Sequence, residues 1–302
     1  MNVLVTGATG FVGRYILEEL LARGHSVRGL ARSIPDDSAG HSDIEIVRGD
    51  ITDPGSLTGA FDGMDAVVHL VGIIDEHPSK GVTFERIHEH GTHHVVQAAR
   101  AAGIDTFIHM SANGADPNGE SAYQTSKFAA EEIVRGAGFK HWTVFRPALV
   151  FGRPLPGQPE FCTRLYRTLL RPFPVWPVFG DGKYRLQPVA VEDVASVFVQ
   201  ALDRPGTAGK TYGVAGPESF EYVEILRRIA RGAGLSVRPM IHQPLWLVRP
   251  VVGLLGGSLL PISEDQLTML VSGNTCDISA MMEDFDVEPL PFTEENLSYV
   301  AD

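Results

Sequence analysis

Tyr123 and Lys127 lie four residues apart in a segment with helical periodicity, so both side chains are predicted to project from one face of a helix. A phenol with a pKa of about 10 is a poor acid or base at neutral pH, and a nearby ammonium stabilises its phenolate. Ser111 ends the apolar run before this helix, where its hydroxyl could donate to a substrate carbonyl. A Tyr–Lys pair alone is more often simple surface. Its place beside Ser111, downstream of a glycine-rich loop, favours proton transfer to or from a carbonyl or alcohol.

The glycine-rich loop runs from Thr6 to Gly13, after one apolar run and before a helical segment. Its glycines leave room for a tight turn, for close approach of main-chain amides to a pyrophosphate, and for helix packing on a strand. The helix N-terminus adds N–H donors and the positive end of a dipole. The arrangement predicts dinucleotide binding, and the residues expected at the pyrophosphate are Gly7, Thr9, Gly10, Phe11, Val12 and Gly13.

Two polar residues bear on the choice of nucleotide. The second predicted strand ends at Arg32, where an NAD-specific site usually has an acid that accepts from the ribose hydroxyls. Arg32 could pair with a 2′-phosphate, so NADP(H) is the preferred cofactor and NAD(H) the second choice, although a solvated surface arginine is equally plausible. Asp50, after the third strand, could accept from the adenine amino group or could cap a turn.

The scaffold for these residues is predicted from short apolar runs that alternate with helical patterns over the first 150 residues. The runs are continuous rather than alternating, as expected for strands buried on both faces. The predicted strands are 2–6, 26–31, 44–48, 66–70, 106–111, 142–146 and 211–214. The fold class is therefore α/β, a doubly wound parallel sheet (Rossmann fold) with a smaller, mostly helical C-terminal lobe.

Prolines crowd together after Phe151–Gly152 and break the strand-helix rhythm, which marks a second lobe. We predict a dinucleotide-binding domain over 1–152, with 186–215 returning to it, and a substrate or partner lobe over 153–185 and 216–302. The apolar stretch 244–261 is interrupted by Arg249, Pro250 and three glycines, so it is too short to span a membrane. We favour a packed helical piece over a peripheral contact with lipid or a membrane complex.

Composition excludes several function classes. The formal net charge of −12 disfavours nucleic acid as a partner. Cys162 and Cys276 are far apart, and the N-terminus has no signal-like segment, so we expect a cytoplasmic protein, at most peripheral at the inner face of a membrane. His90 and His94 share a helix face without a third ligand, so no metal site is expected. The apolar loops of the second lobe favour an apolar small-molecule substrate, and the sequence leaves the oligomeric state open.

The runs Thr6 to Gly13 and Tyr123 to Lys127, with Asp50 and Ser111, resemble the short-chain dehydrogenase/reductase superfamily in its extended or atypical, epimerase/dehydratase-like branch. Within that branch the runs 68–74, 107–112, 145–152, 180–182, 187–194 and 211–217 are similar to bacterial relatives of the nucleotide-binding accessory subunit of respiratory complex I. The resemblance implies Tyr123 as catalytic acid/base, Lys127 as the residue that holds the nicotinamide ribose and tunes the tyrosine, and Ser111 as the residue that orients the reacting oxygen.

The resemblance also implies further cofactor-binding residues, which are Ile51, Leu70, Val71, Gly72, His88, Pro147, Ala148, Leu149 and Val150. The family's Asn-Ala-Gly pattern after the fourth strand is replaced by Leu70–Val71–Gly72, and its structural asparagine by His88, which would weaken a water-linked proton relay. The function expected first is an NADP(H)-dependent oxidoreductase. The alternatives are an accessory or assembly protein of a membrane-associated complex with little turnover, and a nucleotide-sugar epimerase or dehydratase.

Overall fold

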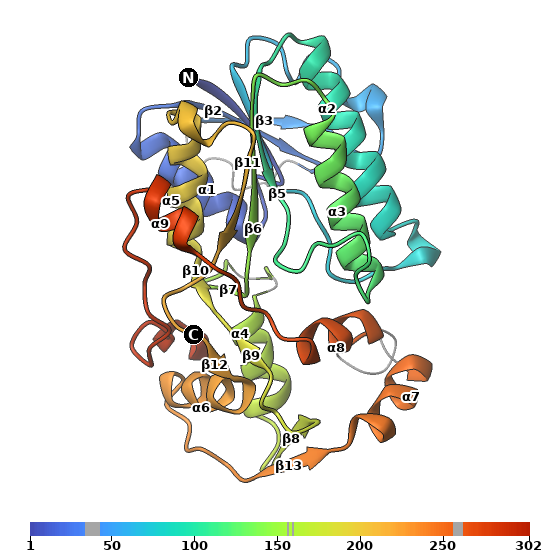
Figure 1. The fold of residues 1–302 in the computed structure, drawn as a ribbon, viewed down its shortest axis with the longest axis vertical. Coiled ribbons are helices and arrows are strands. Elements are labelled where there is room, and N and C mark those ends of the chain that lie inside the picture. The colour runs from blue at the N-terminus through green and yellow to red at the C-terminus, as the bar shows by residue number, and fades with distance from the viewer. Residues whose placement is uncertain (34–42, 156, 159, 256–261) are drawn as a thin grey trace. The chain divides into compact units, whose positions relative to one another are not determined.

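The computed structural model describes residues 1–33, 43–155, 157–158, 160–255 and 262–302 (Figure 1). The strands are β1 Asn2–Thr6, β2 Ser26–Ala31, β3 Ile44–Arg48, β4 Ala66–His69, β5 Thr106–Met110, β6 His141–Pro147, β7 Val150–Phe151, β8 Trp176–Phe179, β9 Arg185–Leu186, β10 Val189–Ala190, β11 Lys210–Val214, β12 Phe220–Glu221 and β13 Met240–Gln243. The helices are α1 Phe11–Ala22, α2 Gly91–Ala101, α3 Ala122–Arg135, α4 Phe161–Leu165, α5 Val191–Leu202, α6 Tyr222–Gly232, α7 Leu245–Leu255, α8 Glu264–Val271 and α9 Ser279–Asp284.

The main sheet of the described chain has seven strands in the order β11-β6-β5-β4-β1-β2-β3. The ladders that join β1 through β6 are all parallel. The order departs from the chain sequence at β1, where the sheet grows first in one direction and then in the other. Ligands of open α/β sheets bind at this switch point, outside the carboxyl ends of the strands. The predicted doubly wound fold is confirmed.

Helices cover both faces of this sheet. Figure 1 shows α2 and α3 on one side and α1 and α5 on the other. On the α2/α3 side, Leu4, Val67 and Phe107 from three neighbouring strands belong to one buried cluster with Val95 and Val134 from the two helices. The strand runs are continuously apolar because each face of the sheet packs against a helix layer. Capping boxes at Ser121–Gln124 and Ser263–Gln266 open α3 and α8.

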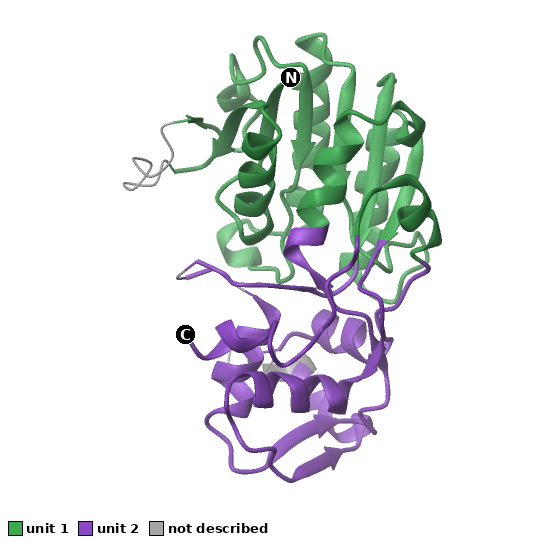
Figure 2. Ribbon diagram, turned by 90° about the vertical axis from the view of Figure 1, so that its left-hand side faces the viewer, with its two compact units in different colours: residues 1–147, 194–213, 278–287 green, residues 148–193, 214–277, 288–302 purple. Residues whose placement is uncertain are grey.

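The chain divides into two compact units, coloured separately in Figure 2. The first comprises 1–147, 194–213 and 278–287, and the second comprises 148–193, 214–277 and 288–302. This division lies a few residues inside the limits expected from the sequence and moves 278–287 from the second lobe to the first. The reason is visible within the first unit, where Phe285 packs on Phe145 of β6 and on Tyr212 of β11 at ring-centroid distances of 5.6 and 5.0 Å.

The second unit contains α4, α6, α7 and α8 with three two-stranded sheets. Its core is built around Trp176, Leu226 and Phe292. The apolar stretch 244–261 forms α7 over its first part, while 256–261 lie outside the described residues. In the described part of the chain, none of the helices combines the length and the apolar character needed to cross a membrane.

Candidate functional site

The glycine loop at the end of β1 leaves little or no room for side chains in place of its glycines. Gly7 has φ +74°, a conformation that favours glycine, and its carbonyl accepts from the Gly10 N–H at 3.0 Å. A Cβ on Gly13 would lie 2.2 Å from the Gly7 carbonyl oxygen, and one on Gly10 would lie 3.1 Å from it. Gly10 is the N-cap residue of α1 and offers no side-chain acceptor to the first turn, whose amides lack partners within a helix. Backbone donors at a helix N-terminus suit a pyrophosphate, so the loop fits a dinucleotide.

The residues expected near the adenosine lie at the ends of β2 and β3. Arg32 directly follows β2 and is exposed, and residues 34–42 beyond it lie outside the described part of the chain. Asp50 Oδ1 accepts from the main-chain N–H and the hydroxyl of Thr52, at 2.8 and 2.9 Å. This is the turn-capping role that the sequence left open for Asp50. Ile51 is buried, and its carbonyl oxygen lies 2.7 Å from Nδ1 of His94.

The end of β4 is tied to the glycine loop through a buried histidine. Thr6 Oγ1 lies 2.6 Å from Nδ1 of His69, whose Nε2 lies 3.0 Å from Thr92 Oγ1. Burial lowers the pKa of His69 to about 3, so the ring is neutral. Leu70 and Val71 follow directly and come within 3.4 Å of where a Gly7 Cβ would be. The predicted cofactor bed and the glycine loop are therefore adjacent.

His88 joins this bed to the start of α3. Its Nε2 accepts from the Ile73 N–H at 3.0 Å, so the neutral ring carries its proton on Nδ1, which lies 2.9 Å from Ser126 Oγ. Ser126 in turn donates to the carbonyl of Tyr123 at 2.9 Å. Burial, followed by the charge of Lys127, lowers the pKa of His88 to about 2. His88 is a fixed neutral bridge, located in a π-helical turn (Glu85–His90), a distortion often found at functional sites.

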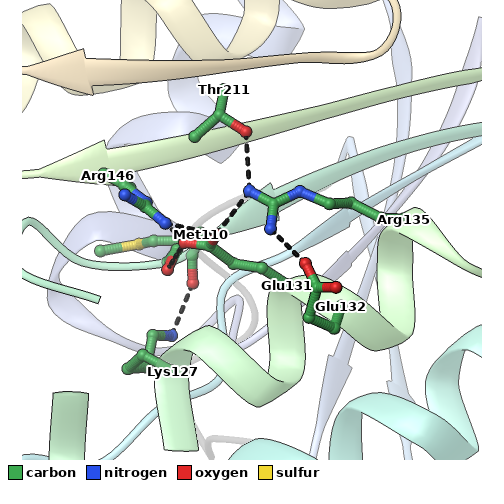
Figure 3. A network of polar contacts seen from close by, with 8 residues as sticks. Met110, Lys127, Glu131, Glu132, Arg135, Arg146 and Thr211 are labelled. Carbon is green, nitrogen blue, oxygen red and sulfur yellow. Dashed lines mark hydrogen bonds and ion pairs between the residues drawn. The ribbon is translucent and has the colours of Figure 1, made fainter. Parts of the chain in front are cut away.

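Tyr123 and Lys127 occupy the first two turns of α3, as predicted. The Tyr123 ring makes edge contacts with Phe84 and His88, at centroid distances of 5.7 and 5.6 Å. Lys127 is buried, and its ammonium donates to the Met110 carbonyl at the end of β5, at 2.7 Å (Figure 3). Burial lowers the pKa of Lys127 to about 8 and raises that of Tyr123 to about 12. The lowering of the phenol's pKa by Lys127 is absent from this arrangement and stays a prediction for the nucleotide-bound chain.

The hydrogen bond that Ser111 makes differs from the one expected of it. Its hydroxyl donates to Glu131 Oε1 of α3, and the serine is buried. Glu131 is fully buried and also accepts two hydrogen bonds from Arg146, at 2.7 and 2.8 Å, and one from Arg135, at 2.7 Å (Figure 3). A hydroxyl has a single proton to donate. With that proton committed to Glu131, Ser111 cannot also donate to a substrate oxygen in this arrangement.

The sequence analysis did not predict a role for Glu131, Arg135 and Arg146, although the spacing of two of them along α3 could have indicated one. Tyr123, Lys127, Glu131 and Arg135 follow one another at intervals of four, so they form a single polar stripe along α3. An acid and two cations in an amphipathic helix are usually surface residues. The inward direction of the stripe becomes clear only once Arg146 of β6 is placed against it.

The remaining predicted cofactor-binding residues are divided between the two compact units. Pro147 ends β6 in the first unit, and its carbonyl accepts from the Asn113 N–H at 2.9 Å. Ala148, Leu149 and Val150 belong to the second unit. Gly72 is exposed, and a Cβ there would lie 3.4 Å from His88 Nε2. Within the described ranges, no group of three or more His, Cys, Asp or Glu side chains is placed to hold a metal ion.

Comparison with known proteins gives consistent matches. Residues 3–215 match the family model described as the NAD dependent epimerase/dehydratase family. The chain is 28% identical over 305 residues to the NADH-ubiquinone oxidoreductase 40 kDa subunit of Neurospora crassa mitochondria, covering 98% of this chain and 78% of that one. It is 31% identical over 237 residues to a ceramide reductase of Caulobacter vibrioides, covering 78% and 72%.

Among solved structures, MoeE5 in complex with UDP-glucose and NAD superposes with a TM-score of 0.76 at 21% identity, covering 100% of this chain and 97% of that one. At this identity the likeness shows the fold alone. The sequence-based resemblance is confirmed by the family match over residues 3–215 and by the likeness to the 40 kDa subunit.

Proposed function

Because the chain belongs to the NAD dependent epimerase/dehydratase family, we propose that it is an NADP(H)-binding oxidoreductase acting on a carbonyl or alcohol of a small molecule. One observation carries the proposal. Lys127 is buried one helical turn after Tyr123, with its ammonium held at the carboxyl end of β5, in the same sheet whose β1 ends in the glycine loop. Burying an ammonium costs free energy, and the burial of Lys127 is explained if its ammonium binds a cofactor.

The roles of the chain's own groups follow from their positions. A bound nucleotide would supply the hydride for reduction of a carbonyl or accept it from an alcohol, and the amides of the glycine loop would hold its pyrophosphate. Lys127 is a donor for the nicotinamide ribose, and its charge favours the phenolate form of Tyr123. Tyr123 moves the proton to or from the substrate oxygen. His88 positions Tyr123 through Ser126, and Ser111 positions α3 through Glu131, without touching the substrate.

The bed formed by Leu70, Val71 and Gly72 and the wall formed by Pro147, Ala148, Leu149 and Val150 are part of the same proposal. Support for the bed comes from its contact with Gly7 and from the His88 bond to the Ile73 amide. The substrate class that this proposal favours is an apolar compound.

A Tyr123→Phe variant tests the catalytic assignment. Parent and variant would be screened with carbonyl compounds and alcohols, with oxidation or reduction of the nucleotide followed by absorbance at the nicotinamide band. We expect turnover to fall about a hundredfold or more, because the phenol proton is gone while nucleotide binding is kept. A variant as active as the parent would remove the role. Sugar nucleotides form a second arm, in which epimerisation or dehydration without net change in the cofactor would indicate the alternative chemistry.

The preference for NADP(H) rests on Arg32 and on the lack of an acid at the end of β2. Thermal shifts with NADPH, NADP, NADH and NAD measure it, since a bound nucleotide raises the apparent stability by RT ln(1 + [L]/Kd). We expect NADPH to protect best and Arg32→Ala to lose that advantage. Arg48, exposed at the end of β3, is the matched control as Arg48→Ala. Stronger protection by NADH would contradict the preference.

A second candidate function is that of a nucleotide-binding accessory protein, peripheral at the inner face of a membrane, with little turnover. It is favoured by the engagement of Ser111 with Glu131 and by the likeness of nearly the whole chain to a 40 kDa subunit of an NADH-ubiquinone oxidoreductase. It predicts nucleotide-induced thermal shifts, no turnover across the screen, and recovery of the tagged chain with respiratory complexes. Absence from those complexes would argue against it.

A further inference from the structure

Helix α7 in the second unit is apolar on both of the sides that the structure describes. Val248 and Val252 face inward and form a buried cluster with Leu267 of α8. On the other side, Trp246, Leu247 and Val251 are 73%, 51% and 48% exposed. Large exposed apolar side chains that gather on one side of a helix mark a surface that meets a partner or a membrane. Because α8 covers one side, α7 offers the other to an apolar environment outside the unit.

Exposed apolar residues also occur on and before the strands that precede α7. β13 leads into α7 and pairs in parallel with β8, and Ile241 of β13 is 59% exposed. Phe173 and Val237 precede these two strands and are also exposed, and Arg238 donates to the Phe173 carbonyl at 2.5 Å. Figure 1 shows β8, β13 and α7 at the same end of the second unit. The six exposed apolar residues, named here the α7 surface, are Phe173, Val237, Ile241, Trp246, Leu247 and Val251.

Two exposed cations lie on α7 and beside it. Arg249 is on α7 itself, between Trp246 and Val251 in the chain. The arginines of α6, by contrast, are paired with Glu224. Lys183 is exposed and lines, with His242, Asp181 and Trp246, an open hollow of about 850 Å³ beside α7. Cations thus border the apolar residues.

We propose that the α7 surface docks on an anionic phospholipid bilayer. Trp246, Leu247 and Val251 enter the boundary between headgroups and acyl chains, a depth that tryptophan prefers, and Arg249 and Lys183 lie at the phosphates. A bilayer supplies an apolar phase and an anionic layer at the same time, which matches the two properties of this surface. This proposal is independent of the hydride-transfer assignment.

Co-sedimentation of the full chain with vesicles tests the docking. Vesicles of phosphatidylcholine alone are compared with vesicles of two parts phosphatidylcholine and one part phosphatidylglycerol. We expect the parent to bind the anionic vesicles about tenfold or more tightly than the neutral ones. The double variant Trp246→Ser/Leu247→Ser should lose about tenfold or more of the anionic binding. The matched control is Met282→Ser, an equally apolar residue that is 44% exposed in α9 of the first unit, and it should bind like the parent.

Tryptophan emission gives an independent readout of the same event. Of the three tryptophans, Trp176 is buried and Trp142 is half-buried, while Trp246 is strongly exposed. Anionic vesicles should shift the emission of the parent to shorter wavelength, and Trp246→Phe should abolish the shift while retaining sedimentation.

Three outcomes would overturn the proposal. The parent could remain in the supernatant with both vesicles, or the double variant could sediment like the parent. Sedimentation velocity could also reveal a self-association that the double variant loses, in which case a second copy of the chain covers the surface. Thermal shifts with nucleotides, measured on the same preparations, should be equal in parent and double variant. That equality separates a failure of membrane docking from a failure of the proposed function.

Discussion

Glu131→Gln removes the charge at the centre of the buried network under the candidate site while keeping nearly the same shape. The carboxylate accepts from Ser111, twice from Arg146 and once from Arg135. Removing one partner of a buried ion pair costs about 3 to 5 kcal/mol. The Arg146 and Arg135 side chains are 27% and 25% exposed, so water partly compensates them, and the amide oxygen still accepts. We therefore expect a loss of about 2 to 3 kcal/mol in the free energy of unfolding.

Denaturant unfolding followed by circular dichroism measures this loss, and calorimetry gives the change in Tm. Glu132→Gln is the control, because it is the same change at the next residue of the same helix. Glu132 pairs with Arg135 at 2.5 Å but is 55% exposed, so its loss should cost below about 1 kcal/mol. Equal effects of the two substitutions, or an effect of Glu131→Gln below about 0.5 kcal/mol, would refute the idea that burial makes this network strong.

Three further outcomes are expected. Burial lowers the pKa of Lys127 to about 8, so the folded chain releases this proton at a lower pH than the unfolded chain does. The free energy of unfolding of the parent should therefore rise relative to that of Lys127→Met as pH rises from 8 toward 10. Denaturant unfolding at each pH measures this difference. No change in that difference would contradict the burial. His88→Phe should reduce the nucleotide-induced thermal shift, because the Ile73 N–H after β4 loses its acceptor. His90→Phe, at an exposed position, should leave the shift unchanged. Gly13→Ala should abolish the shift because its Cβ would lie 2.2 Å from a loop carbonyl, while Gly206→Ala, in open space, should keep it; similar behaviour of the two would show that the loop is not the nucleotide site.

The sequence by itself determined the strands of the main sheet and their order along the chain. β1, β2 and β3 begin and end at the residues expected from their patterns. These features are local, because a continuous apolar run, a capping box or a glycine triplet acts through neighbours a few residues away. Gly10 and Gly13 belong to the same class, since both are crowded by the Gly7 carbonyl, whereas Gly7 itself is crowded by Leu70 and Val71 from the end of β4.

The tertiary structure alone decided which way the polar side chains at the strand ends point. Ser111 directly follows β5, which ends one residue short of the expected strand end, and its partner is set by Glu131 from α3, which Arg146 from β6 holds in place. A side chain at a strand end can turn to either face of the sheet, and a shift of one residue reverses the choice. The inward polar stripe of α3, the burial of Lys127 and the return of 278–287 to the first unit likewise depend on segments far apart in sequence, because burial and charge pairing belong to the packed chain rather than to any single segment.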